Sequence, residues 1–396
     1  MTNNGALKGI RILDMGRVIS APVCTMILAD MGAEVIKVEE PKSGDDARTW
    51  APVKDGESAY FIHFNRSKKG ITLDLKKGRD VFLKMVQEVD ILVENFRPGV
   101  MEKLGFGYEA LKKINPGLIY ASISGFGQNG PDSQRAGYDT IAQARSGIMS
   151  ITGFPGSPPV RCGASITDIM AGLHATIGIL AALQNRNNTG EGQHVDVALT
   201  DAGVFAAASV LEVYLGSGRV VSRMGNGYEA TAPGGGYPTK DGYVVFSCGN
   251  QKRYEMLCDL MERPDLKTQP EFLTESMRVR NRPALDAIID AWTGSKTEKE
   301  LLDLLIENGF ACTSVSTIDE VVQDPQIAEA RNMFPTIEHP VYGELKVINQ
   351  VAKLSATPAG PKCAAPLLGQ HNEDVYCNLL GLSLDEIAAM KENKII

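Results

Sequence analysis

The chain has 396 residues, of which 43% are hydrophobic and 22% charged, as in globular proteins, and its length suits two or three domains. Its net charge of −8 at pH 7 argues against nucleic-acid binding, because phosphate backbones attract basic surfaces. The seven cysteines show no CxxC spacing, so we expect neither a zinc ribbon nor a disulfide framework. Residues 1–8 lack a signal pattern and no uninterrupted apolar run reaches about 18 residues, so we expect a cytoplasmic protein with no membrane partner.

Strand and helix patterns alternate through the first 200 residues. A strand at 9–14, a helix at 22–31 and a strand at 33–39 form the pattern of a parallel βαβ unit. Similar patterns predict strands at 70–75, 91–94, 118–124 and 194–199, and helices at 78–89 and 167–187. The alternation predicts an α/β fold with an open, Rossmann-like sheet covered by helices.

The sequence changes character near residue 224, where a segment rich in Gly and Pro runs to residue 240. The patterns beyond it predict strands at 242–247 and 310–315 and helices at 252–261, 282–293 and 297–308. We therefore expect three parts. Residues 1–224 form a large domain, residues 225–335 a smaller α+β domain, and residues 336–396 a C-terminal segment that returns to the large domain.

The opening βαβ unit raises the hypothesis of a dinucleotide-dependent dehydrogenase. The first strand is followed by Met15-Gly16-Arg17-Val18-Ile19-Ser20-Ala21-Pro22, which has one glycine where the dinucleotide fingerprint has three. Pro22 also removes an amide from the start of the helix. We therefore do not expect NAD or FAD binding, and we interpret Glu39-Glu40 as a solvated strand end rather than a ribose ligand.

Other common catalytic motifs are missing from the sequence. The five histidines show neither HxxxH nor HxH spacing, so we predict no metal site. The segment Ser124-Gly125-Phe126-Gly127 does not match the nucleophile elbow of serine hydrolases, and no Gly-Lys pair is followed by Ser or Thr as in a phosphate-binding P-loop.

Asp168 lies at the start of the long apolar helix predicted at 167–187. Ser165 and Asp168 have the spacing of a capping box, which is a purely structural interpretation. A helix N-terminus also stabilises an ionised carboxylate, which can act as a nucleophile. The two interpretations are compatible.

Basic residues cluster in the N-terminal half, for example in Asn65-Arg66-Ser67-Lys68-Lys69. We interpret most of them as solvated surface charges. Phe96-Arg97 differs, because an aromatic face beside a guanidinium suits a ligand that carries a nucleotide.

Several long segments together resemble the class III (CaiB/BaiF-type) coenzyme A transferases, the group of formyl-CoA and carnitine CoA-transferases. The N-terminal ones are Gly9-Ile10-Arg11-Ile12-Leu13-Asp14, Gly32-Ala33-Glu34-Val35-Ile36-Lys37-Val38-Glu39 and Asn65-Arg66-Ser67-Lys68-Lys69. They continue with Asp90-Ile91-Leu92-Val93-Glu94-Asn95-Phe96-Arg97-Pro98-Gly99, Gly137-Tyr138-Asp139, the Asp168 helix, Gly190-Glu191-Gly192-Gln193 and Leu368-Gly369-Gln370-His371-Asn372. The resemblance spans nearly the whole chain.

The resemblance implies a homodimer whose two chains are interlinked, no permanently bound cofactor, and coenzyme A or acyl-CoA as substrate. It also implies that Asp168 is the catalytic nucleophile. Its carboxylate would attack the thioester of an acyl-CoA donor to give a mixed anhydride, which CoA would convert to an aspartyl-CoA thioester. A small carboxylic acid would then accept the CoA.

The same resemblance assigns coenzyme A contacts to residues of the N-terminal half. They are Val18, Ile19, Leu73, Lys76, Asn95, Phe96, Arg97, Lys103, Ala136, Gly137, Tyr138 and Asp139. It assigns a substrate loop to Cys248, Gly249, Asn250 and Gln251. This loop has fewer glycines than the lid of formyl-CoA transferase, and Glu40 stands where family members often have a cation. Together with the Gly-rich segment after Met224, the loop favours an organic acid larger than oxalate or formate.

Two alternatives within this resemblance stay open. An α-methylacyl-CoA racemase would share the fold and the aspartate, but racemases of this type have a histidine acid/base where this chain has Tyr138. With a reference pKa near 10, tyrosine is a poor base at neutral pH, which favours the transferase. A non-catalytic CoA-binding protein would keep the Phe96-Arg97 site but would not need Asp168.

Overall fold

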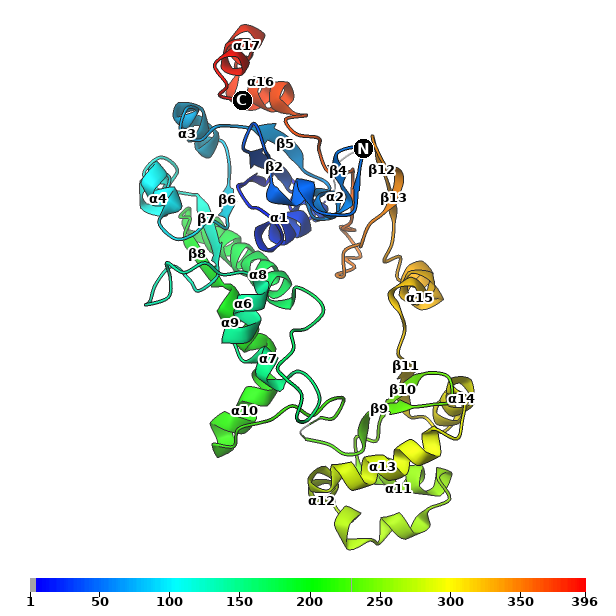
Figure 1. The fold of residues 1–396 in the computed structure, drawn as a ribbon. Helices are drawn as coiled ribbons and strands as arrows, with labels where there is room; N and C mark the ends of the chain where they lie inside the picture. Colours follow the sequence, from blue (N-terminus) through cyan, green and yellow to red (C-terminus); the bar gives the residue numbers. More distant parts are fainter. Residues whose placement is uncertain (1–4, 229) are drawn as a thin grey trace. The chain divides into compact units, whose positions relative to one another are not determined.

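The computed structural model describes residues 5–228 and 230–396 and divides into two compact units (Figure 1). The larger unit comprises Met1–Ile148, Arg161–Ala207 and Pro325–Ile396, and the smaller comprises Met149–Val160 and Ala208–Asp324. The sequence places the smaller domain at 225–335, whereas the smaller unit begins earlier, ends earlier and includes a short excursion near residue 155.

The larger unit is built on a six-stranded, all-parallel sheet with the order β5-β2-β1-β6-β7-β8. Its strands are β1 (Arg11–Asp14), β2 (Glu34–Glu39), β5 (Lys69–Thr72), β6 (Ile91–Glu94), β7 (Ile119–Ser124) and β8 (His194–Ala198). The chain first builds outward from β1 in one direction and then from β6 in the other. Because the direction reverses between β1 and β6, the carboxyl ends of these two strands flank the position where doubly wound sheets bind ligands.

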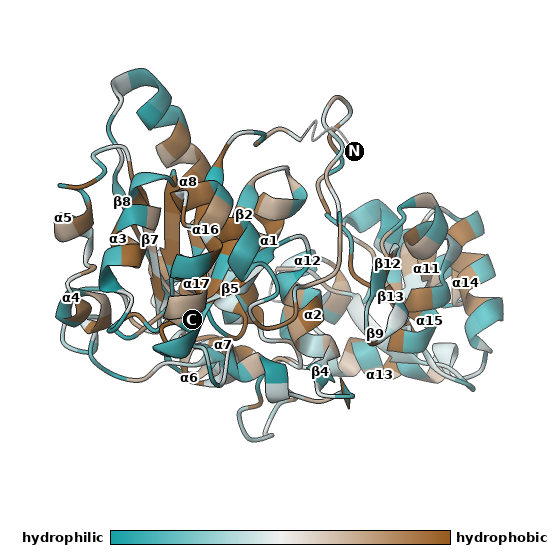
Figure 2. Cartoon of the chain, turned by 90° about the horizontal axis from the view of Figure 1, so that it is seen from above, coloured by the Kyte–Doolittle hydropathy of each residue, from teal (hydrophilic) through white to brown (hydrophobic). Residues whose placement is uncertain are grey.

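Successive residues of each strand pack into two different cores. Ile12 of β1 packs with α1 (Ser20–Asp30) and α8 (Ile166–Thr189) on one face, whereas Leu13 packs with α3 (Arg79–Gln87) on the other. Both residues are fully buried, which explains why the strands are nearly continuous apolar runs. Figure 2 shows this apolar character in α1, α8 and the sheet.

Several shorter elements complete the larger unit. Its other helices are α2 (Ala59–Asn65), α4 (Val100–Leu104), α5 (Tyr108–Leu111), α6 (Asp139–Arg145), α9 (Leu199–Ala206), α16 (Asn372–Leu380) and α17 (Leu384–Glu392). Two hairpins pair β3 (Val53–Lys54) with β4 (Glu57–Ser58) and β12 (Thr336–His339) with β13 (Gly343–Lys346). Along the chain, the division between the two units falls within the helix α7 (Ile148–Ile151), after Ile148.

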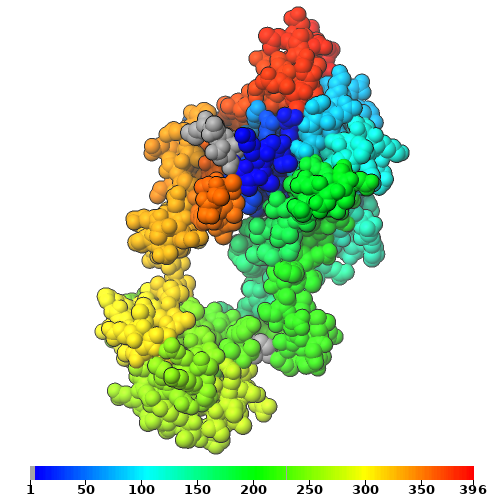
Figure 3. Space-filling model, turned by 180° about the vertical axis from the view of Figure 1, so that it is seen from behind, coloured from blue at the N-terminus to red at the C-terminus, as the bar shows by residue number. Residues whose placement is uncertain are grey.

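The C-terminal segment covers the open edge of β5. The Nδ1 atom of His371 accepts a hydrogen bond from the N–H of Gly70 at 3.0 Å, and Oδ1 of Asn372 accepts one from the N–H of Thr72 at 2.8 Å. These contacts satisfy edge groups that would otherwise be open to another strand. Figure 3 shows the C-terminal residues in red beside the light-blue residues of the first third of the chain.

The smaller unit has a three-stranded antiparallel sheet with the order β11-β10-β9. Its strands are β9 (Gly234–Pro238), β10 (Tyr243–Ser247) and β11 (Ala311–Ser314), and its helices are α10 (Ala208–Ser217), α11 (Gln251–Leu260), α12 (Glu275–Arg280), α13 (Arg282–Thr293), α14 (Glu298–Glu307) and α15 (Ile318–Gln323). Its core lies between this sheet and α11, α13 and α14, around Phe246, Leu257 and Leu305.

The long helix α8 is apolar enough to cross a membrane by length and composition alone. In this structure it serves as a core helix of the larger unit. Ala171, Ala175 and Ile179 are fully buried on the face that packs into the core shared with α1.

Candidate active site

A cavity of about 170 Å³ lies where the direction of strand building reverses. Its walls come from the turn after β1, the loop after β6, the end of β7, the loop before α6 and the start of α8. The lining residues include Arg17, Val18, Ile19, Ser20, Asn95, Phe96, Arg97, Ser124, Gly125, Arg135, Ala136, Gly137, Tyr138, Asp168 and Leu199. Eight predicted CoA contacts therefore lie around one cavity together with Asp168.

Gly125 and Gly137 bring two of these walls together. A Cβ atom on Gly125 would lie only 2.6 Å from the Cα atom of Gly137, so the two backbones approach more closely than side chains would allow. This contact holds the loop that carries Tyr138 against the end of β7. The Tyr138 side chain itself is 70% exposed.

Three arginines line the cavity together with two carboxylates, those of Asp46 and Asp168, and the guanidinium of Arg17 lies 3.7 Å from the Asp46 carboxylate. The guanidinium of Arg17 lies 5.9 Å from the centre of the Phe96 ring, and that of Arg135 lies 5.5 Å from the centre of the Phe126 ring. Arg97 follows Phe96 directly and is exposed. Guanidinium groups beside aromatic faces suit a ligand that carries both phosphates and a planar base.

A second cavity of about 300 Å³ adjoins the first, since Arg17 and Phe96 line both. Leu73 and Lys76, two further predicted CoA contacts, line this second cavity. Glu40 lines it as well, and its carboxylate accepts hydrogen bonds from the N–H and the Oγ–H of Ser43, which hold its pKa below the usual range. A negative charge thus stands where the family resemblance leads us to expect a cation.

Asp168 lies in the first turn of α8, partly buried in the cavity wall. Burial, with a smaller contribution from the charge of Asp139, raises its pKa to about 7. This corrects the expectation that the helix N-terminus keeps the carboxylate ionised. The desolvation of the charged form outweighs the attraction of the helix dipole.

The capping-box interpretation is also wrong, because the side chain of Ser165 makes no capping hydrogen bond. Asp139 caps the helix instead. Its Oδ1 accepts hydrogen bonds from the N–H of Thr167 at 2.9 Å and from the Thr167 hydroxyl at 2.7 Å. Gln143 donates to its Oδ2 at 2.7 Å, and Arg161 lies 3.8 Å from the same oxygen. Asp139, a predicted CoA contact, is buried and does not line the cavity.

Glu94, the last residue of β6, makes a hydrogen bond to the backbone of Phe96. Its Oε2 accepts a hydrogen bond from the Phe96 N–H at 2.7 Å, and burial raises its pKa to about 7. A large share of the Glu94 carboxyl groups is therefore protonated at neutral pH.

Three charged residues of the larger unit are buried, contrary to the sequence-based interpretation. Glu39 accepts two hydrogen bonds from Arg48, at 2.7 and 2.8 Å, and is therefore no solvated strand end. Arg66 and Lys68 form buried ion pairs with Asp30 at 2.7 Å and Asp14 at 2.9 Å. Each buried charge has a counter-charge in contact, as desolvation requires.

The other predicted site residues lie elsewhere. Lys103 is an exposed residue of α4 that lines neither cavity. In the smaller unit, Cys248 is buried at the end of β10 and burial raises its pKa to about 12, while Asn250 caps α11 by accepting from the Arg253 N–H at 3.0 Å. The substrate role of this loop stays a prediction.

Sequence reasoning missed several wall residues, among them Arg17, Ser20 and Leu199. Arg17 lies in the turn after the first strand and Ser20 at the start of the helix that follows it. That position was the available signal, because loops at the carboxyl ends of parallel strands meet at one edge of the sheet. Leu199 gave no comparable signal, since its place in the wall depends on how α9 packs.

The fold and the cavity define an α/β protein with a doubly wound parallel sheet, which presents the carboxylates of Asp46 and Asp168 among three arginines at the switch point of that sheet. Comparison with known proteins then identifies the family. The profile described as CoA-transferase family III matches residues 7–372. The chain belongs to this family and is a CoA-transferase that uses CoA thioesters as substrates.

Individual relatives agree with this assignment. The chain is 38% identical to succinyl-CoA–D-citramalate CoA-transferase of Chloroflexus aurantiacus, over 98% of each protein. It is 36% identical to human succinyl-CoA:glutarate CoA-transferase, over 96% of this chain and 87% of the human protein. A crystal structure of a CaiB/BaiF family protein from Brucella suis superposes with a TM-score of 0.84 at 36% identity, covering 95% of this chain and all of that one.

Proposed function

We propose that this CoA-transferase works through covalent catalysis by Asp168. The observation that carries the proposal is that the Asp168 carboxylate lines the same cavity as Arg17, Arg97 and Arg135. The arginines suit the phosphates of an acyl-CoA. Asp168 belongs to the core helix α8, whereas the other acidic residue of the cavity, Asp46, belongs to a short 3-10 helix and lies 3.7 Å from Arg17.

The proposed reaction has four steps, in which acyl groups pass between CoA, the two acids and Asp168. An Asp168 oxygen attacks the thioester carbonyl, the C–S bond breaks, and CoA leaves as a thiolate from a mixed anhydride. The thiolate then attacks the carbonyl carbon of Asp168, giving an aspartyl-CoA thioester and releasing the donor acid. The acceptor carboxylate attacks the carbonyl carbon of this thioester, the C–S bond breaks, and CoA leaves as a thiolate from a second mixed anhydride. The thiolate then attacks the acceptor carbonyl carbon of this anhydride, which gives the new acyl-CoA and releases the Asp168 carboxylate.

We further propose succinyl-CoA as the donor and a dicarboxylic acid of about the size of glutarate as the acceptor. The support comes from the two relatives described above, which are named for succinyl-CoA and a five-carbon dicarboxylate. An acceptor of this size also agrees with the expectation of an acid larger than oxalate.

We propose a homodimer with interlinked chains as the working form. Its support is an apolar patch on α8 and α9 of the larger unit, formed by Leu173, Ile177, Val204 and Phe205, which are 40%, 61%, 46% and 62% exposed. A patch of this kind is typical of an interface. A second copy of the chain would cover it.

Trapping with hydroxylamine tests the mechanism. The protein is mixed with succinyl-CoA, acetyl-CoA or oxalyl-CoA, quenched with hydroxylamine and mapped by peptide mass spectrometry. A mass increase of about 15 Da on Asp168, one NH unit, is expected with at least one donor, because hydroxylamine converts the activated carboxyl to a hydroxamate.

Asp168→Asn should lose both the label and CoA transfer. Asp385→Asn removes a carboxylate from the first turn of another helix, α17, and should keep both. CoA transfer without any label on Asp168 would contradict the covalent mechanism. Exchange of the α-proton of a 2-methylacyl-CoA without transfer would favour the racemase.

A further inference from the structure

The turn between β1 and α1, residues 16–18, is held by side chains from the end of β1, from β2 and from the residue that follows β6. The N–H of Gly16 donates to Asp14 at 2.8 Å, and the carbonyl of Gly16 accepts from the Nζ of Lys37 at 2.7 Å. The N–H and the carbonyl of Arg17 bond to the side-chain amide of Asn95, both at 2.8 Å. Four successive backbone groups therefore have side-chain partners, which fixes the path of the turn.

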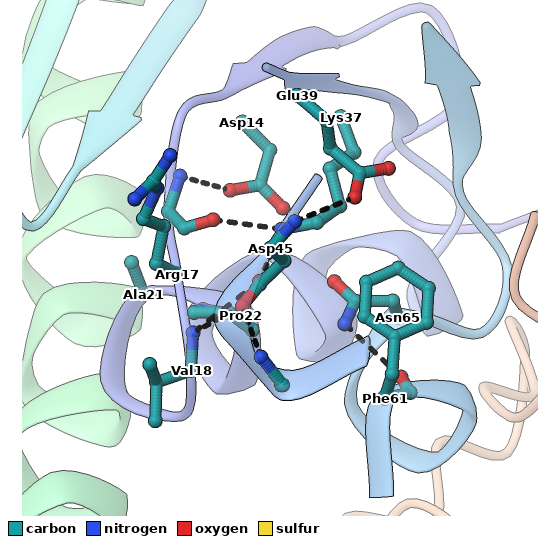
Figure 4. A network of polar contacts seen from close by, with 12 residues as sticks. Asp14, Arg17, Val18, Ala21, Pro22, Lys37, Glu39, Asp45, Phe61 and Asn65 are labelled. Atoms are coloured by element: carbon teal, nitrogen blue, oxygen red, sulfur yellow. Dashed lines mark hydrogen bonds and ion pairs between the residues drawn. The ribbon is translucent and has the colours of Figure 1, made fainter. Parts of the chain in front are cut away.

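Val18 is the strained residue of this turn. Its φ of 67° lies in the left-handed region, which β-branched residues rarely adopt. The carboxylate of Asp45 accepts the Val18 N–H at 3.1 Å and also receives a hydrogen bond from the Nζ of Lys37 at 3.0 Å. The side chains of Asp45 and Lys37 are 1% and 0% exposed. Figure 4 shows Asp45 between Val18 and Lys37, with Glu39 accepting from the Asp45 N–H.

Ser20, which follows Val18 by two residues, lies against α8, the helix that carries Asp168. A Cβ atom on Gly172 would lie 2.7 Å from the carbonyl oxygen of Ser20, so α8 and Ser20 are in close contact there. Asp168 precedes Gly172 by four residues and therefore lies one turn away on the same face of α8. The position of residues 18–20 thus sets the distance between one cavity wall and the carboxylate.

We propose that Asp45, together with Lys37, is a positioning residue for CoA transfer. It does not line the cavity. It acts through Val18, whose left-handed conformation it stabilises, and so keeps the cavity wall at a fixed place beside Asp168. The inference rests on the proposed role of Asp168, because the wall would act by placing the thioester against this carboxylate. It predicts an effect on the rate of the chemical steps rather than on the affinity for CoA.

The test compares Asp45→Ala, Asp45→Asn and the double variant Asp45→Ala/Val18→Gly. CoA transfer is measured with the donor and acceptor that give the wild-type protein its highest rate, and CoA binding is measured by calorimetry. Asp45→Ala should lower kcat by about tenfold or more and change KM by less than about threefold, because small displacements of the reacting groups slow oriented reactions strongly. Asp45→Asn keeps an oxygen acceptor for the Val18 N–H and should lose less.

The double variant separates positioning from general damage to the fold. Glycine adopts a φ of 67° without steric cost, so the turn no longer needs Asp45 to hold this conformation. We therefore expect the double variant to be faster than Asp45→Ala alone. Asp30→Asn is the matched control, since it breaks another fully buried ion pair, with Arg66, away from the turn. It should lower the melting temperature and leave kcat unchanged.

Three results would overturn the inference. The first is that Asp45→Ala and Asp45→Asn have the same kcat as Asp30→Asn. The second is that KM and the CoA dissociation constant of the Asp45 variants rise in parallel. The third is that the double variant is no faster than Asp45→Ala. If Asp45→Ala does not fold, Asp45→Asn with and without Val18→Gly gives the same comparison. A wild-type protein that transfers CoA without labelling Asp168 would refute the proposed mechanism, while the kcat values would still decide the role of Asp45.

Discussion

At the scale of single residues, the site sets two electrostatic effects against each other at Asp168. The N-terminus of α8 favours the charged form, which is worth about 1 kcal/mol at such a position. Burial beside Asp139 raises the pKa from the usual value to about 7, a change of roughly 4 kcal/mol. Burial therefore prevails, and the free protein holds a large share of this carboxyl protonated at neutral pH. A poorly solvated carboxylate is also the more reactive nucleophile.

This balance predicts the pH dependence of activity. Only the ionised form of Asp168 can attack, so kcat/KM should fall about tenfold per pH unit below pH of about 7. Asp139→Asn removes the nearby negative charge and should move the midpoint to lower pH. The measurement is kcat/KM for the acyl-CoA donor between pH 5 and 9.

Glu94 provides the control for this profile, because its pKa is also near 7 and it contacts the backbone of Phe96. Glu94→Gln mimics the neutral acid and should leave the midpoint in place. A midpoint that disappears in Glu94→Gln and persists in Asp139→Asn at its original pH would assign the titration to Glu94.

At the residue level, the family resemblance assigned Asn95, Phe96 and Arg97 as CoA contacts, and the structure places them around one cavity with Asp168, while their contact with CoA stays a prediction. The interpretation of buried charges from sequence was wrong. Lys68 was interpreted as a solvated charge because its buried partner, Asp14, lies 54 positions away in the sequence. Such pairs depend on which strands become neighbours, and a local pattern does not contain that information.

At the scale of elements, α1 and α8 pack more closely than two helices with ordinary side chains could. Gly172 makes this possible, since a Cβ atom there would lie 2.7 Å from the carbonyl oxygen of Ser20 and 2.9 Å from a methyl group of Val23. A methyl group at this position must push the helices apart. The backbone oxygen cannot rotate away as a side chain would.

Gly172→Ala should therefore destabilise the fold by roughly 1–3 kcal/mol and lower the activity as the wall of the cavity moves. Gly216→Ala in α10 is the comparison, because a Cβ atom there would have no atom within 4 Å apart from its chain neighbours and the backbone of its own helix. That change should stabilise the protein by about 0.5–1 kcal/mol, as is usual for glycine in a helix. Urea denaturation of both variants measures the difference, and equal stability of the two would contradict the close contact.

The sequence predicted the sheet strands and the long helices well, because burial on both faces makes the strands apolar and helical periodicity is strong over 20 residues. The two hairpins and the short helices, such as α2 and α6, carry too few residues for a reliable pattern. The order of the strands follows from tertiary contacts. It could be expected only from the family resemblance.

At the scale of the whole molecule, the patch on α8 and α9 predicts self-association. Phe205 makes an edge contact with the ring of His174 at 4.8 Å, so the exposed side chains of the two helices adjoin. Light scattering after size-exclusion chromatography should give the mass of two chains, rather than the 42.7 kDa of one. The substitution pair Ile177→Glu and Phe205→Glu should lower this mass, because charges would be buried in the interface.

The control for this experiment is Ile306→Glu on α14 of the smaller unit, whose side chain is 60% exposed. It adds the same charge outside the patch and should leave the mass unchanged. A wild-type protein that elutes as a single chain at all concentrations would contradict the dimer.

The closure of β5 by residues near the C-terminus bears on how the protein is synthesised. The backbone N–H groups of Gly70 and Thr72 donate to the side chains of His371 and Asn372, which follow about 300 positions later in the chain. On the ribosome, the nascent sheet must therefore remain with one exposed edge while most of the chain is translated. Long-range contacts of this kind form slowly, and open strand edges recruit other strands. The slowest and most aggregation-prone period of folding should thus end only when the segment around His371 leaves the exit tunnel.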